Sequence, residues 1–153
     1  MKTNKHGMKS IKYSSIILFV MYLSYLIYLT LFDRFYGRGT FHRKLSIIPF
    51  ETTLKVLTSS HNWNAILINI FGNIAAFIPM GFLLPLVFTR LNKFFGIFTV
   101  VLSATVSIEV LQYITGTGTT DIDDVILNVT GGIVGYLMAK GMIKLFACLG
   151  YNK

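Results

Sequence analysis

The sequence predicts an all-α integral membrane bundle of about four transmembrane helices, with a longer first outer loop. Of the 153 residues, 54% are hydrophobic and only 13% are charged, which is too apolar for an ordinary soluble domain. The apolar residues are gathered in long runs with few charges, separated by short polar segments. A chain of this length has room for about four spans of ~20 residues each and none for a separate soluble domain.

The spans are expected at residues 13–32, 65–88, 94–114 and 122–144. The first follows a lysine-rich start, but it is longer than a signal-peptide core and no cleavage pattern follows it, so it is interpreted as an uncleaved anchor. The third carries a single charge, Glu109. In the fourth, Lys140 and Lys144 must extend their amines to the interface. Together the spans form one domain, 13–147, between a basic segment, 1–12, and a short tail, 148–153.

The first outer loop, residues 33–61, combines basic and apolar groups. Its arginines and Lys44 are suited to a phosphate or an anionic lipid head group. The apolar segment 47–50 is followed by Leu54 and Leu57 at helical spacing, which favours an interfacial helix. A solvated loop with ordinary lipid contacts explains the pattern equally well. The arginines of this loop that we consider ligand-binding candidates are Arg34, Arg38 and Arg43.

Charge predicts the orientation. With the N-terminus in the cytoplasm, nine of the 14 basic residues lie inside and five outside, in agreement with the positive-inside rule. All six acidic residues then lie at or near the outer side. We therefore expect a multi-pass protein of the cytoplasmic membrane with both termini in the cytoplasm. No basic stretch interleaved with aromatic residues is present, so nucleic acid is not an expected partner.

Polar residues of three spans lie on shared helix faces near the outer ends, which predicts one outward-facing polar cavity. Hydrogen bonding between helices is the simpler interpretation of the amides. An ionisable residue inside a span, by contrast, is typical of a functional site. Asp123 points away from this face and is expected to cap its helix, and Gly131 and Gly135 are expected to pack helices together. The ligand-binding candidates on the spans are Asn69, Asn73, Glu109, Gln112, Asp121, Asp124 and Asn128.

Four ordered blocks give the chain a likeness to a known family. They are Leu31-Phe32-Asp33-Arg34; Ile48-Pro49-Phe50; the segments 69–73 and 77–81; and Glu109-xx-Gln112 followed by the segments 121–128 and 131–132. In this set the chain resembles the VanZ-like membrane proteins, a bacterial family named for a teicoplanin-resistance protein. It departs from many members in having Gly118-Thr119-Thr120 where they carry an Arg, and Ser46 in the region where an Asn is frequent. The resemblance implies a multi-spanning protein of the bacterial cytoplasmic membrane and a link to glycopeptide resistance.

Two functions agree with these features. The first is binding of a membrane lipid or a lipid-linked cell-wall precursor at the outer face, which would reduce access of a glycopeptide such as teicoplanin. The second is an enzyme acting on a polyprenyl-phosphate or similar lipid, with a divalent cation such as Mg²⁺ held by Glu109, Asp121 and Asp124. The histidines are isolated and Cys148 lies on the inner side, so no nucleophile–base pair is recognisable. This favours binding over covalent catalysis.

Overall fold

A computed structural model describes residues 4–31, 45–59, 63–116 and 120–148. Four long helices dominate it, and each is long and apolar enough to cross a membrane. The all-α membrane bundle predicted from the sequence is therefore confirmed. The long helices are α1 (Asn4–Leu31), α3 (Trp63–Val87), α4 (Phe94–Thr115) and α5 (Ile122–Cys148), and the short elements are β1 (Leu45–Ser46), α2 (Glu51–Ser59), η2 (Thr89–Leu91) and β2 (Thr120–Asp121).

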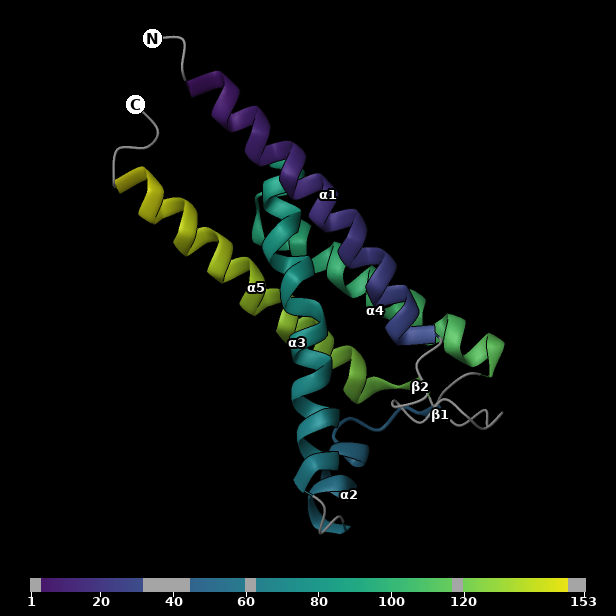
Figure 1. The fold of residues 1–153 in the computed structure, drawn as a ribbon. Helices are drawn as coiled ribbons and strands as arrows, with labels where there is room; N and C mark the ends of the chain where they lie inside the picture. Colours follow the sequence, from purple (N-terminus) through teal and green to yellow (C-terminus); the bar gives the residue numbers. More distant parts are fainter. Residues whose placement is uncertain (1–3, 32–44, 60–62, 117–119, 149–153) are drawn as a thin grey trace.

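The helices are arranged so that α1 starts and α5 ends at the same end of the molecule (Figure 1). The end of α4, the start of α5 and the two short strands lie towards the other end. Helix α3 has its most extensive contacts with α5 and crosses it near the middle of the bundle. The first turns of α3 extend past this crossing and lie beside α2.

Glycine permits the close crossing of α3 and α5. A Cβ atom on Gly131 would lie 2.1 Å from the carbonyl oxygen of Ile74, and one on Gly135 would lie 2.0 Å from that of Ile78. Neither distance is possible for a real Cβ atom, so the two backbones touch where only a glycine fits. The packing role expected for this glycine pair is confirmed.

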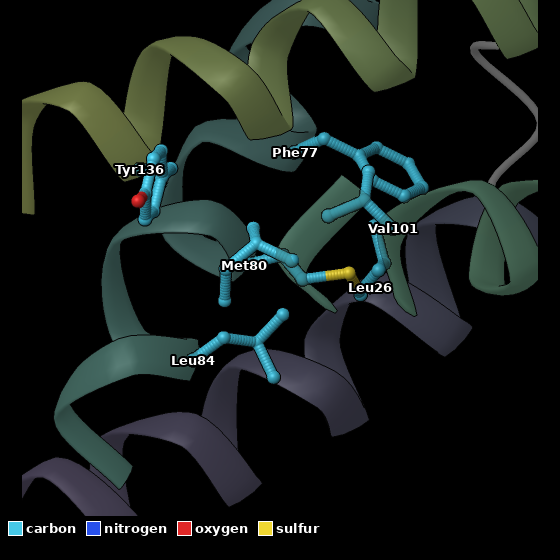
Figure 2. Packing of buried hydrophobic residues seen from close by; sticks show 7 residues of the cluster. Leu26, Phe77, Met80, Leu84, Val101 and Tyr136 are labelled. Atoms are coloured by element: carbon cyan, nitrogen blue, oxygen red, sulfur yellow. The ribbon is translucent and has the colours of Figure 1, made fainter. Parts of the chain in front are cut away.

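The apolar core lies at the same crossing and joins all four long helices (Figure 2). Leu26 of α1, Phe77 of α3, Val101 of α4 and Tyr136 of α5 are buried there. Pro79 lies in α3 beside this core and lacks the N–H that would bond to the carbonyl oxygen of Ala75. The Tyr22 hydroxyl of α1 donates to the carbonyl oxygen of the next residue, Ala76, at 2.8 Å and so joins α1 to α3.

A short parallel ladder ties the first loop to the start of α5. Strand β1 pairs with β2 in the register Leu45↔Thr120 and Ser46↔Asp121. No pattern in the sequence indicates this ladder, because strands of two residues are too short to show an alternation of apolar and polar side chains. The helix expected in the loop is present as α2, and Ile47, Phe50 and Leu54 around it are exposed apolar residues.

Candidate functional site

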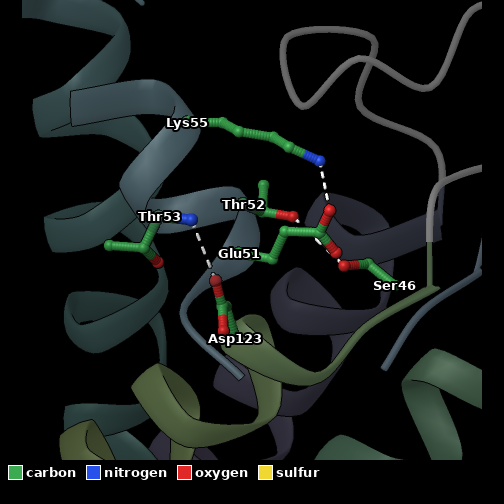
Figure 3. A network of polar contacts seen from close by, with 6 residues as sticks. All are labelled: Ser46, Glu51, Thr52, Thr53, Lys55 and Asp123. Atoms are coloured by element: carbon green, nitrogen blue, oxygen red, sulfur yellow. Dashed lines mark hydrogen bonds and ion pairs between the residues drawn. The ribbon is translucent and has the colours of Figure 1, made fainter. Parts of the chain in front are cut away.

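The three aspartates at the start of α5 have three different partners. The Asp121 carboxylate accepts a hydrogen bond from the backbone N–H of Asp123 at 3.0 Å, which makes Asp121 the N-cap of α5. The Asp123 carboxylate accepts from the backbone N–H group of Phe50 at 2.5 Å. It also accepts from the backbone N–H group of Thr53 at 2.9 Å (Figure 3). Asp123 therefore caps α2, and the expectation that it caps its own helix is wrong. The third aspartate, Asp124, faces α3.

The start of α2 depends on the Asp123 carboxylate. Phe50 precedes the helix with a φ of 65°, a left-handed conformation that costs a non-glycine residue about 1 kcal/mol. The hydrogen bond from its N–H to Asp123 offsets this cost. Two contacts complete the arrangement, an ion pair between Lys55 and Glu51 and a 3.4 Å hydrogen bond from the Thr52 hydroxyl to Ser46 Oγ (Figure 3).

Asp124 and Glu109 each accept a hydrogen bond that connects neighbouring elements near the start of α5. Asn73 Nδ2 of α3 donates to Asp124 Oδ1 at 2.5 Å. Glu109 Oε2 of α4 accepts from the backbone N–H of Asp121 at 3.0 Å, and the Thr120 hydroxyl donates to the backbone oxygen of Glu109 at 3.1 Å. Both carboxylates thus hold neighbouring elements together.

Two amides make further polar contacts between helices. Gln112 Nε2 of α4 donates to the backbone oxygen of Thr30 in α1 at 2.9 Å. Asn128 Nδ2 of α5 donates to the hydroxyl of Thr105 in α4, also at 2.9 Å, and the Thr105 residue is completely buried. Hydrogen bonds of this kind hold helices together within a membrane.

A small cavity lies among these side chains. About 20 Å³ of it is open to molecules the size of water, which is room for about one water molecule. Every long helix contributes to its wall, and Thr30, Ala76, Phe77 and Ile108 provide part of the lining. The predicted site residues that line it are Asn73, Glu109, Gln112, Asp124 and Asn128.

Asn128 stands out within this wall. Its residue is 5% exposed, and its Oδ1 atom is buried with no hydrogen-bond partner among the residues that the structure describes. Leaving a buried acceptor unpaired costs about 1–3 kcal/mol. The side-chain nitrogen is turned to Thr105, which is not part of the lining, so the oxygen is the atom left for the cavity.

The other predicted site residues do not reach the cavity. Asn69 is half-buried on α3, one turn nearer the start of that helix. Asp121 is buried but its carboxylate caps α5. Arg34, Arg38 and Arg43 lie outside the described residues. The structure therefore brings five of the predicted site residues together at one cavity, namely Asn73, Glu109, Gln112, Asp124 and Asn128.

The arrangement of the acids bears on the predicted cation site. Within the described ranges, no three His, Cys, Asp or Glu side chains are grouped closely enough to hold a metal ion. Of the predicted ligands Glu109, Asp121 and Asp124, the first and third line the cavity. A divalent cation at this place would rely on these two carboxylates and on the amide oxygens.

Comparison with known proteins gives two matches. The family described as VanZ/LLP1 matches residues 19–146, which is most of the chain. Protein VanZ of Enterococcus faecium is 34% identical over 122 residues, which cover 77% of this chain and 68% of that protein. No solved structure matches the chain.

Proposed function

The chain belongs to the VanZ/LLP1 family of membrane proteins, and from this membership and the cavity we propose that it binds a membrane lipid or a lipid-linked cell-wall precursor. The binding would take place at the outer face of the bacterial cytoplasmic membrane. By holding such a lipid, the protein would reduce the access of a glycopeptide to its target and so confer resistance to teicoplanin. The observation that carries this proposal is the polar cavity lined by all four long helices.

The composition of the cavity wall favours a ligand over helix packing alone. Helices in a membrane can be joined by amides and hydroxyls, as Gln112 joins α4 to α1. Two carboxylates, Glu109 and Asp124, are a far more expensive way to join them. Together with the Oδ1 atom of Asn128, which has no hydrogen-bond partner among the described residues, these carboxylates support the proposal that the cavity binds a ligand.

The apolar segment around α2 supports a location at the membrane surface. Ile47 is 70% exposed, Ile48 60% and Phe50 55%, although all three are apolar. Such residues at the end of a bundle are stable when they lie in the lipid interface. With both termini in the cytoplasm, this segment would lie in the outer leaflet, where Arg34, Arg38 and Arg43 would contact lipid phosphate.

One observation favours the alternative of a membrane enzyme. Glu109 and Asp124 line the same cavity, and two carboxylates plus substrate phosphate are a common set of ligands for Mg²⁺. The protein would then act on a polyprenyl-phosphate or a similar lipid. Lipid analysis separates this alternative from binding, because an enzyme produces a new lipid and a binding protein does not.

The test expresses the wild type, Glu109→Gln and Asp124→Asn in a susceptible bacterial host. Teicoplanin susceptibility and membrane lipids are measured at matched protein levels. We expect the wild type to raise the inhibitory concentration and both variants to lower that gain. Glu51→Gln is the matched control, because Glu51 pairs with Lys55 on α2 and does not line the cavity. Unchanged susceptibility of wild-type cells refutes the resistance proposal, and a lipid product that disappears in both cavity variants establishes the enzyme.

A further inference from the structure

The end of the molecule away from the cavity carries basic side chains without acidic ones. Among the described residues, the acids lie in α2, in the second half of α4 and at the start of α5. At the end where α1 starts and α5 ends, the described chain has basic residues alone (Figure 1). Three of them, Arg90, Lys93 and Lys140, belong to the turn between α3 and α4 and to α5.

Contacts of Tyr136 hold Lys140 near the start of α4. The Lys140 Nζ atom lies 5.7 Å from the centroid of the Tyr136 ring, within the range of a cation–π contact. The Tyr136 hydroxyl donates to the backbone oxygen of Asn92 at 3.3 Å, and its ring centroid lies 6.2 Å from that of Phe94. Because Lys93 stands between Asn92 and Phe94, the amine of Lys140 is brought close to it although the two residues belong to different helices.

These three cations lie at the level of the lipid head groups. The third membrane-spanning helix begins at Phe94, so the exposed Lys93 directly precedes the span and the exposed Arg90 lies three residues earlier. Lys140 is half-buried within the last helix, and a long lysine side chain of this kind extends its amine to the interface. The phosphates of a bilayer lie just outside its hydrocarbon core, which is the same level.

No acidic side chain of the described residues neutralises these cations. The salt bridge that the described residues form joins Lys55 to Glu51 in α2, at the other end of the molecule. Basic groups gathered between membrane helices at this level are suited to an anionic lipid head group. The adjoining surface is suited to acyl chains, because Phe95 is 78% exposed and Leu137 59% exposed.

We propose that Arg90, Lys93 and Lys140 bind the phosphate of an anionic phospholipid in the leaflet at this end of the molecule. With both termini in the cytoplasm, that leaflet is the inner one. The lipid joins the turn between α3 and α4 to α5 by neutralising cations of both. This site is separate from the cavity and goes beyond the proposed function, because it takes a second lipid at the opposite side of the membrane.

Competition between two lipids that differ in net charge tests this inference. The purified full chain in detergent is offered equal amounts of phosphatidylglycerol and phosphatidylcholine with identical acyl chains, and bound lipid is measured by native mass spectrometry. We expect phosphatidylglycerol to be retained at least about tenfold better, because only this lipid carries a net negative charge. Equal retention of the two lipids overturns the proposal. Displacement of phosphatidylglycerol by excess glycerol phosphate, which lacks acyl chains, would assign the site to a soluble phosphate and also overturn it.

Variants locate the preference within the protein. Lys93→Gln and Lys140→Gln each remove one charge and should lower the preference for phosphatidylglycerol about fivefold. Lys140→Arg keeps the charge and should retain the preference. Lys55→Gln is the matched control, since it removes a lysine charge at the other end of the molecule. If Lys55→Gln lowers the preference as much as Lys140→Gln does, the preference follows the net charge of the protein and the proposal is wrong.

A chain that carries both Lys93→Gln and Lys140→Gln gives the strictest test of the site. Its preference for phosphatidylglycerol should fall more than that of either single variant, and an unchanged preference overturns the proposal. The proposed function is tested separately by teicoplanin susceptibility in cells. Loss of resistance with an intact preference for phosphatidylglycerol refutes the proposed function alone, and equal lipid retention with intact resistance refutes this inference alone.

Discussion

Replacing Asp123 by alanine tests whether this carboxylate caps a helix that starts more than 70 residues earlier in the chain. Asp123 is 3% exposed and accepts hydrogen bonds from Phe50, 73 residues away, and from Thr53, 70 residues away. Loss of an N-cap costs about 0.5–2 kcal/mol, and the left-handed Phe50 then keeps its strain without compensation. We expect α2 to open more easily by about 2 kcal/mol.

Hydrogen–deuterium exchange measures this change where it occurs. At 1.4 kcal/mol for each factor of ten, about 2 kcal/mol accelerates exchange of the α2 amides about 30-fold. The Thr53 amide should respond most, because it is itself a donor to Asp123, and the amides at the start of α5 should keep their protection because Asp121 caps that helix. Asp123→Asn, which keeps an acceptor without the charge, should give an intermediate effect. Unchanged exchange in α2 with faster exchange at the start of α5 would refute the assignment.

Three other predictions concern the bundle. Gly131→Ala and Gly135→Ala should each lower the thermal unfolding temperature in detergent, because the new Cβ atom would lie about 2 Å from a carbonyl oxygen of α3. Gly141→Ala is the control and should be neutral or stabilising, because a Cβ atom there would have no neighbour within 4 Å. A double-mutant cycle of Asn73→Leu and Asp124→Leu should show a favourable coupling of about 0.6–2 kcal/mol, and no coupling would mean that the contact between α3 and α5 contributes nothing. Gln112→Leu should weaken the contact of α4 with α1 by about 1 kcal/mol in chemical unfolding, with exposed Thr99→Val as a control that leaves unfolding unchanged.

The sequence predicted the helices well because each leaves a local signal. Apolar runs of membrane-spanning length mark them, and the regular period of a helix placed Asn73, Glu109, Gln112, Asp124 and Asn128 on faces that meet at one cavity. This part of the prediction needed only geometry within each helix. The prediction of these helix faces therefore did not require knowledge of how the helices cross.

The positions of three residues differ from the sequence-based expectation for reasons that the sequence could not show. Asp121 was put on the same helical face as Asp124, but α5 begins at Ile122, so the helical period does not apply to Asp121. Asn69 shares a helix with Asn73, but it lies one turn nearer the start of α3 and does not line the cavity. The partners of Asp123 belong to another helix, and such a contact exists only after the chain has folded.

The same side chains join the helices and form the cavity wall, so most substitutions at the site affect both stability and binding. Asp124→Leu removes a charge and also the contact with Asn73. Glu109→Gln is different, because a glutamine oxygen can still accept from the backbone N–H of Asp121 while the negative charge is gone. If the cavity serves only to join helices, this variant should retain both the unfolding temperature and the resistance of the wild type. If the cavity binds a lipid as proposed, the unfolding temperature should change little while the resistance falls, and that separation is the result by which a binding site differs from a structural contact.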